Sequence, residues 1–329
     1  MTNKPTSPLL SALFLALFAG AAHAADSTPP AAEKPKADAD MALVPAGDFI
    51  MGSDKKDSVG LQKKEGTVNP YGFVDPIYVD EAPAHKVSVP AFLIDKHEVT
   101  NAQYRDFVIQ TRYRVPYTWP RNGYNASDRT LNAFAVEELR RVALDYFKLD
   151  MEVEKMSKEA ILAELFKIQR TRDNLPVTAV SWSDAFTYCG WAGKRMPTEA
   201  EWEKAARGPD SLEYPWGNDW DVKKVNIGSG ESEAAAAPVG ANPGDKSVYG
   251  VYDLAGNVTE WVYDWYDAYP GSTLQHKDFG QKHKVVRGGM ASAGHYDTLS
   301  YTFRAARRSH VNPETALVDV GFRCAKTAP

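Results

Sequence analysis

The chain has 329 residues, of which 43% are hydrophobic and 25% are charged, a composition typical of a globular protein with a sizeable core. Its formal net charge is −5, and lysine and arginine form no continuous block. Because nucleic acids and anionic membrane surfaces select basic protein faces, these values argue against both classes of partner.

The first 24 residues are typical of a secretory signal peptide. Lys4 precedes an apolar run at 9–20, which is shorter than the roughly 20 residues that a membrane-spanning helix needs. Small residues at Ala22 and Ala24 suit signal peptidase, so we expect cleavage after Ala24 and a periplasmic protein with no membrane span once the signal is removed. A retained anchor helix is the alternative interpretation.

Residues 25–40 carry almost no apolar bulk and include Pro29, Pro30 and Pro35. A segment of this composition buries too little surface to offset the entropy lost on ordering, so we expect a disordered linker. The folded part is then expected to be one domain over 41–329 with insertions.

Three segments alternate apolar and polar side chains as strands do: 43–51, 86–94 and 284–287. Turn residues such as Gly47 and Gly52 bound them. By contrast, residues 213–266 contain four tryptophans without a steady period. We expect this stretch to be irregular and held by side-chain packing and polar contacts.

N-terminal capping patterns predict three short helices. In such a pattern a hydroxyl side chain and a polar side chain three residues later satisfy the first backbone amides. The patterns are Thr100 with Gln103, Thr198 with Glu201, and Ser181 or Ser183 ahead of residues 182–191. Apolar residues also recur at helical spacing over 129–172, and we interpret about 121–172 as a two-helix insertion.

The chain contains two cysteines, Cys189 and Cys324. In an oxidising compartment an even pair far apart in sequence is more often a disulfide than a reactive site. Closing so long a loop would stabilise the fold by roughly 4 to 5 kcal/mol in the chain-entropy model.

Short motifs follow one another along the mature chain. They are LVPAGDFIMGS at 43–53, DEAPAH at 80–85, EVTN at 98–101, GKRMPTEAEWE at 193–203, PWGN at 215–218, YGVYDLAGNVTEW at 249–261, RGG at 287–289 and GFRC at 321–324. In this order they resemble the sulfatase-modifying-factor domain of the formylglycine-generating enzyme superfamily. The resemblance implies an α+β, C-type-lectin-like fold with much irregular structure, a structural calcium ion, and a disulfide between Cys189 and Cys324.

The family's calcium ligands match the carboxylates of Asp253 and Glu260 and the main-chain carbonyls of Gly256 and Val258. The residues themselves favour such a site, because a hard cation prefers several oxygens on a loop that glycine lets turn sharply. The alternative is a turn without metal, whose acidic side chains are solvated.

The sequence departs from the family just after RGG. Formylglycine synthases carry there a cysteine pair that binds copper and oxidises a substrate cysteine, whereas residues 290–301 contain no cysteine. Copper(I) binding and mixed-disulfide capture both need a thiolate, so we expect no cysteine-dependent sulfatase activation. The ergothioneine enzymes of the superfamily hold iron on histidines of a separate helical domain, and the insertion here has no histidine.

Other reactive side chains stand where the cysteine pair is missing. A histidine with a carboxylate binds a divalent metal or transfers protons near neutral pH, and arginine binds anionic groups. We assign His295, Asp297 and Tyr301 as candidate catalytic residues, and Tyr296, Arg304 and Arg307 as candidate substrate-binding residues. The structural alternative is that His295 packs among aromatic side chains and Asp297 caps a turn.

Two functions therefore stay open. The first is an exported oxidoreductase-like enzyme that modifies a periplasmic metabolite or protein, with iron or copper as its redox metal if the mechanism uses one. The second is a non-catalytic, lectin-like binding or scaffold module of a periplasmic complex.

Overall fold

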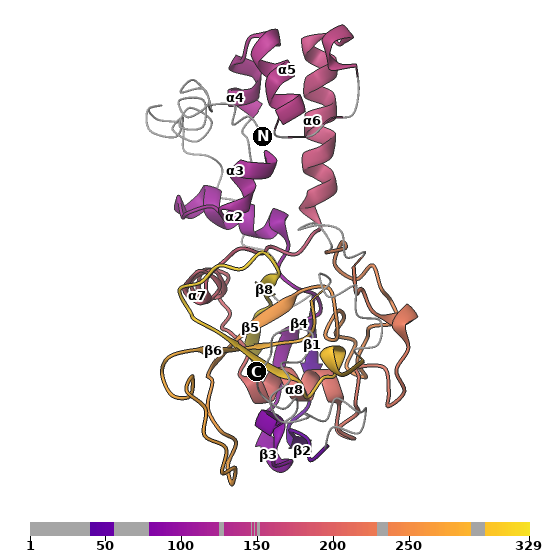
Figure 1. The fold of residues 1–329 in the computed structure, drawn as a ribbon, viewed down its shortest axis with the longest axis vertical. Helices are drawn as coiled ribbons and strands as arrows, with labels where there is room; N and C mark the ends of the chain where they lie inside the picture. Colours follow the sequence, from indigo (N-terminus) through magenta and orange to yellow (C-terminus); the bar gives the residue numbers. More distant parts are fainter. Residues whose placement is uncertain are drawn as a thin grey trace, which may run out of the picture. The chain divides into compact units, whose positions relative to one another are not determined.

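The computed structural model describes residues 40–55, 79–124, 128–145, 147, 149, 152–228, 236–290 and 300–329 (Figure 1). The predicted signal peptide and most of the predicted linker lie outside these residues. The chain forms two compact units: a helical unit, Arg105–Asn174, and a main unit, Pro35–Tyr104 with Leu175–Pro329. No helix among the described residues is both long enough and apolar enough to cross a lipid bilayer.

The helical unit has its own apolar core. It contains α3 (Thr118–Asn122), α4 (Asp128–Ala133), α5 (Val136–Asp145), the short 3-10 helix η2 (Val153–Lys155) and α6 (Lys158–Asp173), and α2 (Asn101–Thr111) leads into it. Its buried side chains include Leu131, Leu139, Val142, Ile161 and Leu165. The helical spacing in the sequence thus marks real helices, α5 and α6, to which the structure adds shorter ones that the spacing did not reveal.

The two ends of the helical unit are tied together by a polar contact. Arg105 donates to the carboxylate of Asp173 (Nη1–Oδ1 2.7 Å) and to the hydroxyl of Tyr124 (3.0 Å). Tyr124 in turn donates to the same carboxylate oxygen (2.6 Å). The chain therefore enters and leaves this unit at one polar junction.

The main unit contains three small sheets. The first orders β1 (Met41–Val44), β4 (Phe92–Asp95) and β9 (Ala325–Thr327); the second pairs β2 (Gly47–Met51) with β3 (His85–Val89). The third orders β7 (Arg308–Val311), β6 (Lys284–Arg287), β5 (Thr259–Trp265) and β8 (Val320–Phe322), with β5 and β8 parallel. Helix α8 (Glu199–Arg207) packs into the main core through Trp202, which is fully buried.

Two of the predicted strands are each divided in the structure. The segment 43–51 becomes β1 and β2, and the segment 86–94 becomes β3 and β4. Pro45 and Pro90 lie at the two breaks, and proline has no amide hydrogen to donate to a ladder. Each half can therefore pair in a different sheet.

The stretch 213–266, expected to be irregular, contains one strand that the sequence did not reveal. The first four residues of β5, from Thr259 to Val262, are all buried. A strand buried on both faces shows no apolar–polar alternation, so it carries no period-two pattern.

The capping predictions are confirmed at all three helices. Thr100 and Gln103 exchange hydrogen bonds at the start of α2 (2.9 and 3.3 Å), and Thr198 and Glu201 do so at α8. At α7 (Trp182–Trp191) the cap is Ser181, which forms a box with Asp184.

The two cysteines are joined, as expected. Cys189 on α7 and Cys324 between β8 and β9 form a disulfide that closes a sequence separation of 135 residues, and both are fully buried. The bond ties the last strands of the chain to a central helix.

Replacing Cys189 and Cys324 together by alanine is expected to lower the free energy of unfolding by roughly 4 to 5 kcal/mol, because the unfolded chain regains the entropy of a long loop. Denaturant unfolding without reductant measures this loss. Thiol titration of the denatured, unreduced wild type should find no reactive thiol, and the reduced sample serves as the positive control. Two reactive thiols without reductant would show that the bond does not form.

Candidate functional site

Four acidic side chains and one arginine meet in the interior of the main unit. We call Glu98, Asp245, Asp253 and Glu260 the acidic cluster, and none of the four is more than 3% exposed. They come from separate parts of the chain: Glu98 precedes α2, Glu260 lies on β5, and the other two lie in the loops before β5. Arg323, which follows β8, is also fully buried.

Arg323 neutralises Glu260. Its guanidinium donates to both carboxylate oxygens (2.7 and 2.6 Å), and Trp202 Nε1 donates to one of them (2.9 Å). The remaining donors of Arg323 bind the main-chain oxygens of Asp95, Lys96 and Tyr252. Of the two carboxylates predicted to bind calcium, Glu260 is therefore already engaged by three hydrogen bonds.

The other predicted ligand, Asp253, lies beside Glu98. Asp253 Oδ2 accepts from Gly240 N (2.6 Å), and Glu98 Oε1 accepts from Asn257 Nδ2 (2.9 Å). Burial raises the pKa of both carboxyls, and the charge of Asp253 raises the pKa of Glu98 further. Glu98 Oε2 is buried and accepts no hydrogen bond from the described residues.

Asp245 completes the acidic cluster. Its carboxylate accepts from the amides of Ala255 and Gly256 at 3.0 Å, and burial together with the charge of Asp253 raises its pKa to about 8. Four carboxylates thus face a single guanidinium in a space with little water. Such a group must take up protons or a cation, and the buried, unpartnered oxygen of Glu98 fits an oxygen-seeking divalent cation.

Gly256, a predicted carbonyl ligand, occupies a position that has no room for a side chain. A Cβ there would lie 2.7 Å from the main-chain oxygen of Asn226 and 2.3 Å from Val225 Cγ2. Only glycine permits this close approach of two backbones. Val258, the other predicted carbonyl ligand, is buried two residues further on.

Sequence reasoning did not assign Glu98 or Asp245 to this site. Glu98 lies within the EVTN motif, which was noted only as part of the resemblance. Asp245 belongs to no motif, and it reaches the cluster through amides ten and eleven residues further along. No local spacing rule marks such a contact.

Several residues predicted as catalytic or substrate-binding lie outside the described residues. These are His295, Tyr296 and Asp297, together with the side chain of Tyr301. Of the predicted substrate-binding arginines, Arg307 is partly exposed and donates to Gly288 O (3.3 Å). Their predicted roles stay predictions.

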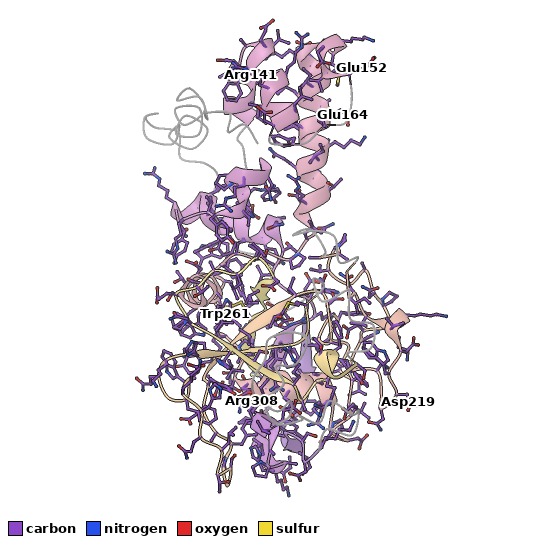
Figure 2. All side chains as sticks on the ribbon, in the orientation of Figure 1. Arg141, Glu152, Glu164, Asp219, Trp261 and Arg308 are labelled. Carbon is purple, nitrogen blue, oxygen red and sulfur yellow. A yellow bond between two sulfur atoms is a disulfide. The ribbon has the colours of Figure 1, made fainter. Side chains whose placement is uncertain are left out.

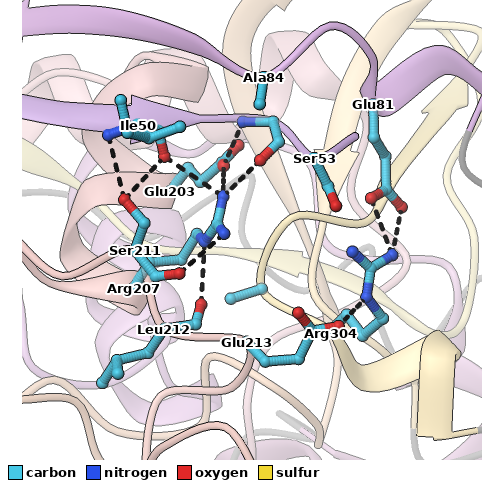
Figure 3. Close-up of polar contacts among 12 residues, drawn as sticks. Ile50, Ser53, Glu81, Ala84, Glu203, Arg207, Ser211, Leu212, Glu213 and Arg304 are labelled. Carbon is cyan, nitrogen blue, oxygen red and sulfur yellow. Dashed lines mark hydrogen bonds and ion pairs between the residues drawn. The ribbon is translucent and has the colours of Figure 1, made fainter. Parts of the chain in front are cut away.

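Arg304 is buried between two carboxylates (Figure 3). Its Nη1 donates to both oxygens of Glu81 (2.9 and 2.8 Å), and its Nε donates to Glu213. An anionic substrate would have to displace one of these carboxylates to bind the guanidinium of Arg304.

A second set of buried ion pairs joins the arginine of the RGG motif to helix α8. Arg287, fully buried, donates to Glu199 (3.0 Å) and Glu203 (2.6 Å) on α8, and Arg308 donates to both oxygens of Glu199 (2.7 and 3.0 Å). Arg287 and Arg308 are direct partners across β6 and β7, so Glu199 separates two like charges. Figure 2 labels Arg308 on β7 and Trp261 on β5, the two strands that flank β6. The arginine of RGG therefore fixes β6 to α8.

A further group of ligand-type side chains was not predicted as a site. His276, Asp278 and His310 bring one ligand atom each within 4.8 Å of one another. The His-x-Asp spacing at 276–278 is a signal that was available in the sequence. His310 is distant in sequence and comes close to the other two through the pairing of β6 with β7.

The comparison with known proteins identifies one family. Residues 26–328 match the Sulfatase-modifying factor enzyme 1-like domain. Formylglycine-generating enzyme from Bos taurus is 30% identical over 324 residues, which covers 89% of this chain and 76% of that protein. The enzyme of the same name from Thermomonospora curvata is 31% identical and covers 87% and 92%.

Two further relatives are informative. Inactive C-alpha-formylglycine-generating enzyme 2 from Mus musculus is 31% identical over 301 residues and covers 88% of this chain and 86% of that protein. The structure of PvdO from Pseudomonas aeruginosa superposes with a TM-score of 0.56 at 23% identity, over 88% and 94% of the two chains. The PvdO likeness concerns the fold alone, and it confirms the predicted α+β, formylglycine-generating-enzyme fold. Because the domain match and the relatives span most of its length, this chain belongs to the Sulfatase-modifying factor enzyme 1-like family of formylglycine-generating enzymes.

Proposed function

We propose that this protein is an exported, oxidoreductase-like member of the family that modifies a periplasmic metabolite or protein without cysteine chemistry. The observation that carries the proposal is the disulfide between Cys189 and Cys324, the only cysteines in the sequence. With both sulfurs bonded and buried, no thiolate is left to bind copper(I) or to form a mixed disulfide with a substrate.

Buried ion pairs anchor the RGG motif, which directly precedes residues 290–301 in the sequence. Arg287, immediately before the two glycines of RGG, is held by Glu199 and Glu203. Functional sites are favoured next to rigid elements of this kind. Among residues 290–301, His295 and Asp297 offer the imidazole and carboxylate that bind iron or copper, and either metal would supply the redox chemistry there.

The same proposal includes export. It is supported by the charged, apolar and small-residue regions of the first 24 residues, which are typical of a signal peptide. An oxidising compartment is also where a disulfide between two distant cysteines persists.

The proposed route predicts that the protein does not convert a sulfatase-derived cysteine peptide into a formylglycine peptide, because no thiol is available to bind the substrate. Mass spectrometry of the peptide after incubation with copper and oxygen measures the conversion. The enzyme from Thermomonospora curvata is the positive control. Aldehyde formation by this protein would contradict the thiol-free route.

Replacing His295 by alanine is expected to abolish stoichiometric iron or copper while leaving the melting temperature of the metal-free protein unchanged, since losing a ligand removes a metal bond without emptying a core. Metal analysis and thermal unfolding measure the two effects. Arg307→Ala should retain the metal and weaken substrate binding. If His295→Ala instead destabilises the fold by about 1 to 3 kcal/mol with metal content unchanged, the histidine is structural.

We also propose that the acidic cluster holds a structural calcium ion. Asp253, Glu260 and the carbonyls of Gly256 and Val258 are the ligands that the family implies, and the position of Glu98 beside Asp253 supports its addition to the set. A bound calcium ion would offset the repulsion among the buried carboxylates, because it supplies the positive charge that Arg323 alone does not.

Calcium removal is expected to lower the melting temperature of the wild type, because an ion bound only to the folded state stabilises it by about 2.7 kcal/mol at a hundred times its Kd. Glu98→Gln should reduce this calcium-dependent gain. With chelator present, the same variant should melt no lower than the wild type, because it removes one of the repelling carboxyls. Differential scanning calorimetry with calcium or chelator measures both.

The surface residue Asp48 offers a matched control. It is exposed and pairs only with Lys86 among the described ion pairs, so Asp48→Asn should leave the calcium-dependent gain unchanged. A wild-type melting temperature that is insensitive to chelator would contradict the calcium proposal.

A non-catalytic binding module is the second candidate function. It is favoured by the 31% identity to a relative that is named inactive, and by the engagement of Arg304 with Glu81 and Glu213. Metal analysis of the purified protein separates the two candidates, since calcium without iron or copper favours the module.

A further inference from the structure

Three histidines and one aspartate converge at the end of the β6–β7 ladder. We call His276, Asp278, His283 and His310 the histidine cluster. His276 and Asp278 lie in the connection between β5 and β6, His283 immediately precedes β6, and His310 is the third residue of β7. All four belong to the main unit.

The strand register explains why His283 and His310 meet. His310 pairs directly with Val285 across the two antiparallel strands. His283 is two residues before Val285, so it projects from the same face and is the diagonal neighbour of His310. Their ring centroids are 5.3 Å apart.

The connection from β5 folds back to bring the other two residues to the same place. Tyr266 donates its amide to His283 O (2.8 Å), and Gly280 donates to Tyr266 O (3.1 Å). His276 then lies with its ring centroid 5.2 Å from that of His310.

The carboxylate of Asp278 is at the centre of the cluster. His310 Nε2 lies 3.2 Å and His276 Nδ1 lies 3.7 Å from Asp278 Oδ2, and His283 Nδ1 lies 3.7 Å from Asp278 Oδ1. A tetrahedral ion with bonds of about 2.0 to 2.1 Å separates its ligand atoms by roughly 3.3 Å. The distances from the three histidines to Asp278 are close to this value, and the ligand atoms of His276, Asp278 and His310 all lie within 4.8 Å of one another.

Aromatic packing holds the imidazole rings in this arrangement. Tyr266 stacks on His310 with ring centroids 4.0 Å apart. The rings of Tyr266 and His276 form a T-shaped pair with centroids 5.6 Å apart. The hydroxyl of Tyr266 donates to Asp80 (2.8 Å), which fixes the tyrosine in turn. Rings that are oriented before an ion arrives lose less entropy when they bind it.

The donor set selects a class of ion. Calcium prefers six or more oxygen ligands, and this cluster offers one carboxylate, whereas imidazole nitrogens suit zinc and its neighbours among the transition metals. The four side chains are between 14% and 26% exposed, so an ion can enter from solvent. His283 Nδ1 is buried and has no hydrogen-bond partner among the described residues.

We propose that the histidine cluster is a binding site for a divalent transition-metal ion of the zinc class. His276, Asp278 and His310 are its first three ligands, with the ion replacing the amide of Asp278 at His276 Nδ1, and rotation of His283 supplies the fourth. The site goes beyond the proposed function, because none of its residues lies between positions 291 and 299 of the sequence.

Zinc titration of the full chain tests this proposal. After chelator treatment and with calcium in excess to occupy the acidic cluster, calorimetry should show one zinc ion bound per chain. Asp278→Asn and His310→Gln should each weaken zinc affinity by roughly 10- to 100-fold or more. His85→Gln, which alters a histidine bonded to Pro83 O, is the matched control and should leave zinc affinity unchanged.

Cobalt(II) provides a measurement that needs no variant. A four-coordinate site of nitrogen and oxygen ligands should give the cobalt-loaded wild type strong visible absorption, which zinc then displaces. Absence of these bands, or wild-type zinc affinity in both Asp278→Asn and His310→Gln, would overturn the proposal. The melting temperatures of the variants in chelator verify that each one folds.

The test also separates this site from the candidate catalytic residues His295 and Asp297. Zinc affinity that is unchanged by His295→Ala and lost in Asp278→Asn supports the histidine cluster. Zinc affinity that is lost in His295→Ala and unchanged in Asp278→Asn overturns the present inference and leaves the proposed function standing.

Discussion

The buried ion pair between Glu260 and Arg323 is the interaction on which the rest of the main unit depends. It joins the parallel strands β5 and β8, and both side chains are fully buried. The same guanidinium satisfies three main-chain oxygens around the first sheet and the loop before β5. Removing one partner of such a pair costs about 3 to 5 kcal/mol, because the other charge stays buried and unpaired.

In this fold, arginine side chains bind many of the main-chain oxygens that long β-strands would otherwise pair. The strands are short, so many main-chain oxygens have no strand partner and need donors from side chains. Arg207 shows the pattern in Figure 3, where it binds the main-chain oxygens of Gly52, Ser211 and Leu212 and the carboxylate of Glu203. A guanidinium has five donors in a rigid plane, which lets one residue anchor several loops.

This dependence explains which parts of the structure could be read from the sequence. The helix caps were predictable because both partners lie within three residues, as at Thr198 and Glu201. The disulfide followed from a count of two cysteines and from the resemblance. Strand β5 was not predicted, because burial on both faces removes the alternation of apolar and polar residues. The alternating pattern also runs through Pro45 and Pro90, where the strands of the structure end.

The candidate sites were harder to predict because they are long-range. Glu98 meets Asn257 across 159 residues, and His310 meets Asp278 across 32 residues and a strand pairing. The motif at 249–261 identified Asp253, whereas Glu98, which lies beside Asp253 in the structure, belongs to the motif at 98–101. Single-sequence reasoning found the two acidic residues that share one motif, Asp253 and Glu260, and only the fold brings Glu98 and Asp245 to them.

The proposed calcium site and the proposed zinc-class site differ in chemistry in a way that would keep their ions apart. The acidic cluster presents carboxylate oxygens in a dry interior, where only a strongly attracted hard cation offsets the loss of its water. The histidine cluster presents three imidazoles and one carboxylate near solvent, and imidazole nitrogen binds zinc-class ions far better than calcium. Each site therefore disfavours the ion of the other through ligand type, so one chain can hold both without a selective entry path. It follows that chelators with different calcium and zinc affinities can empty the two sites separately.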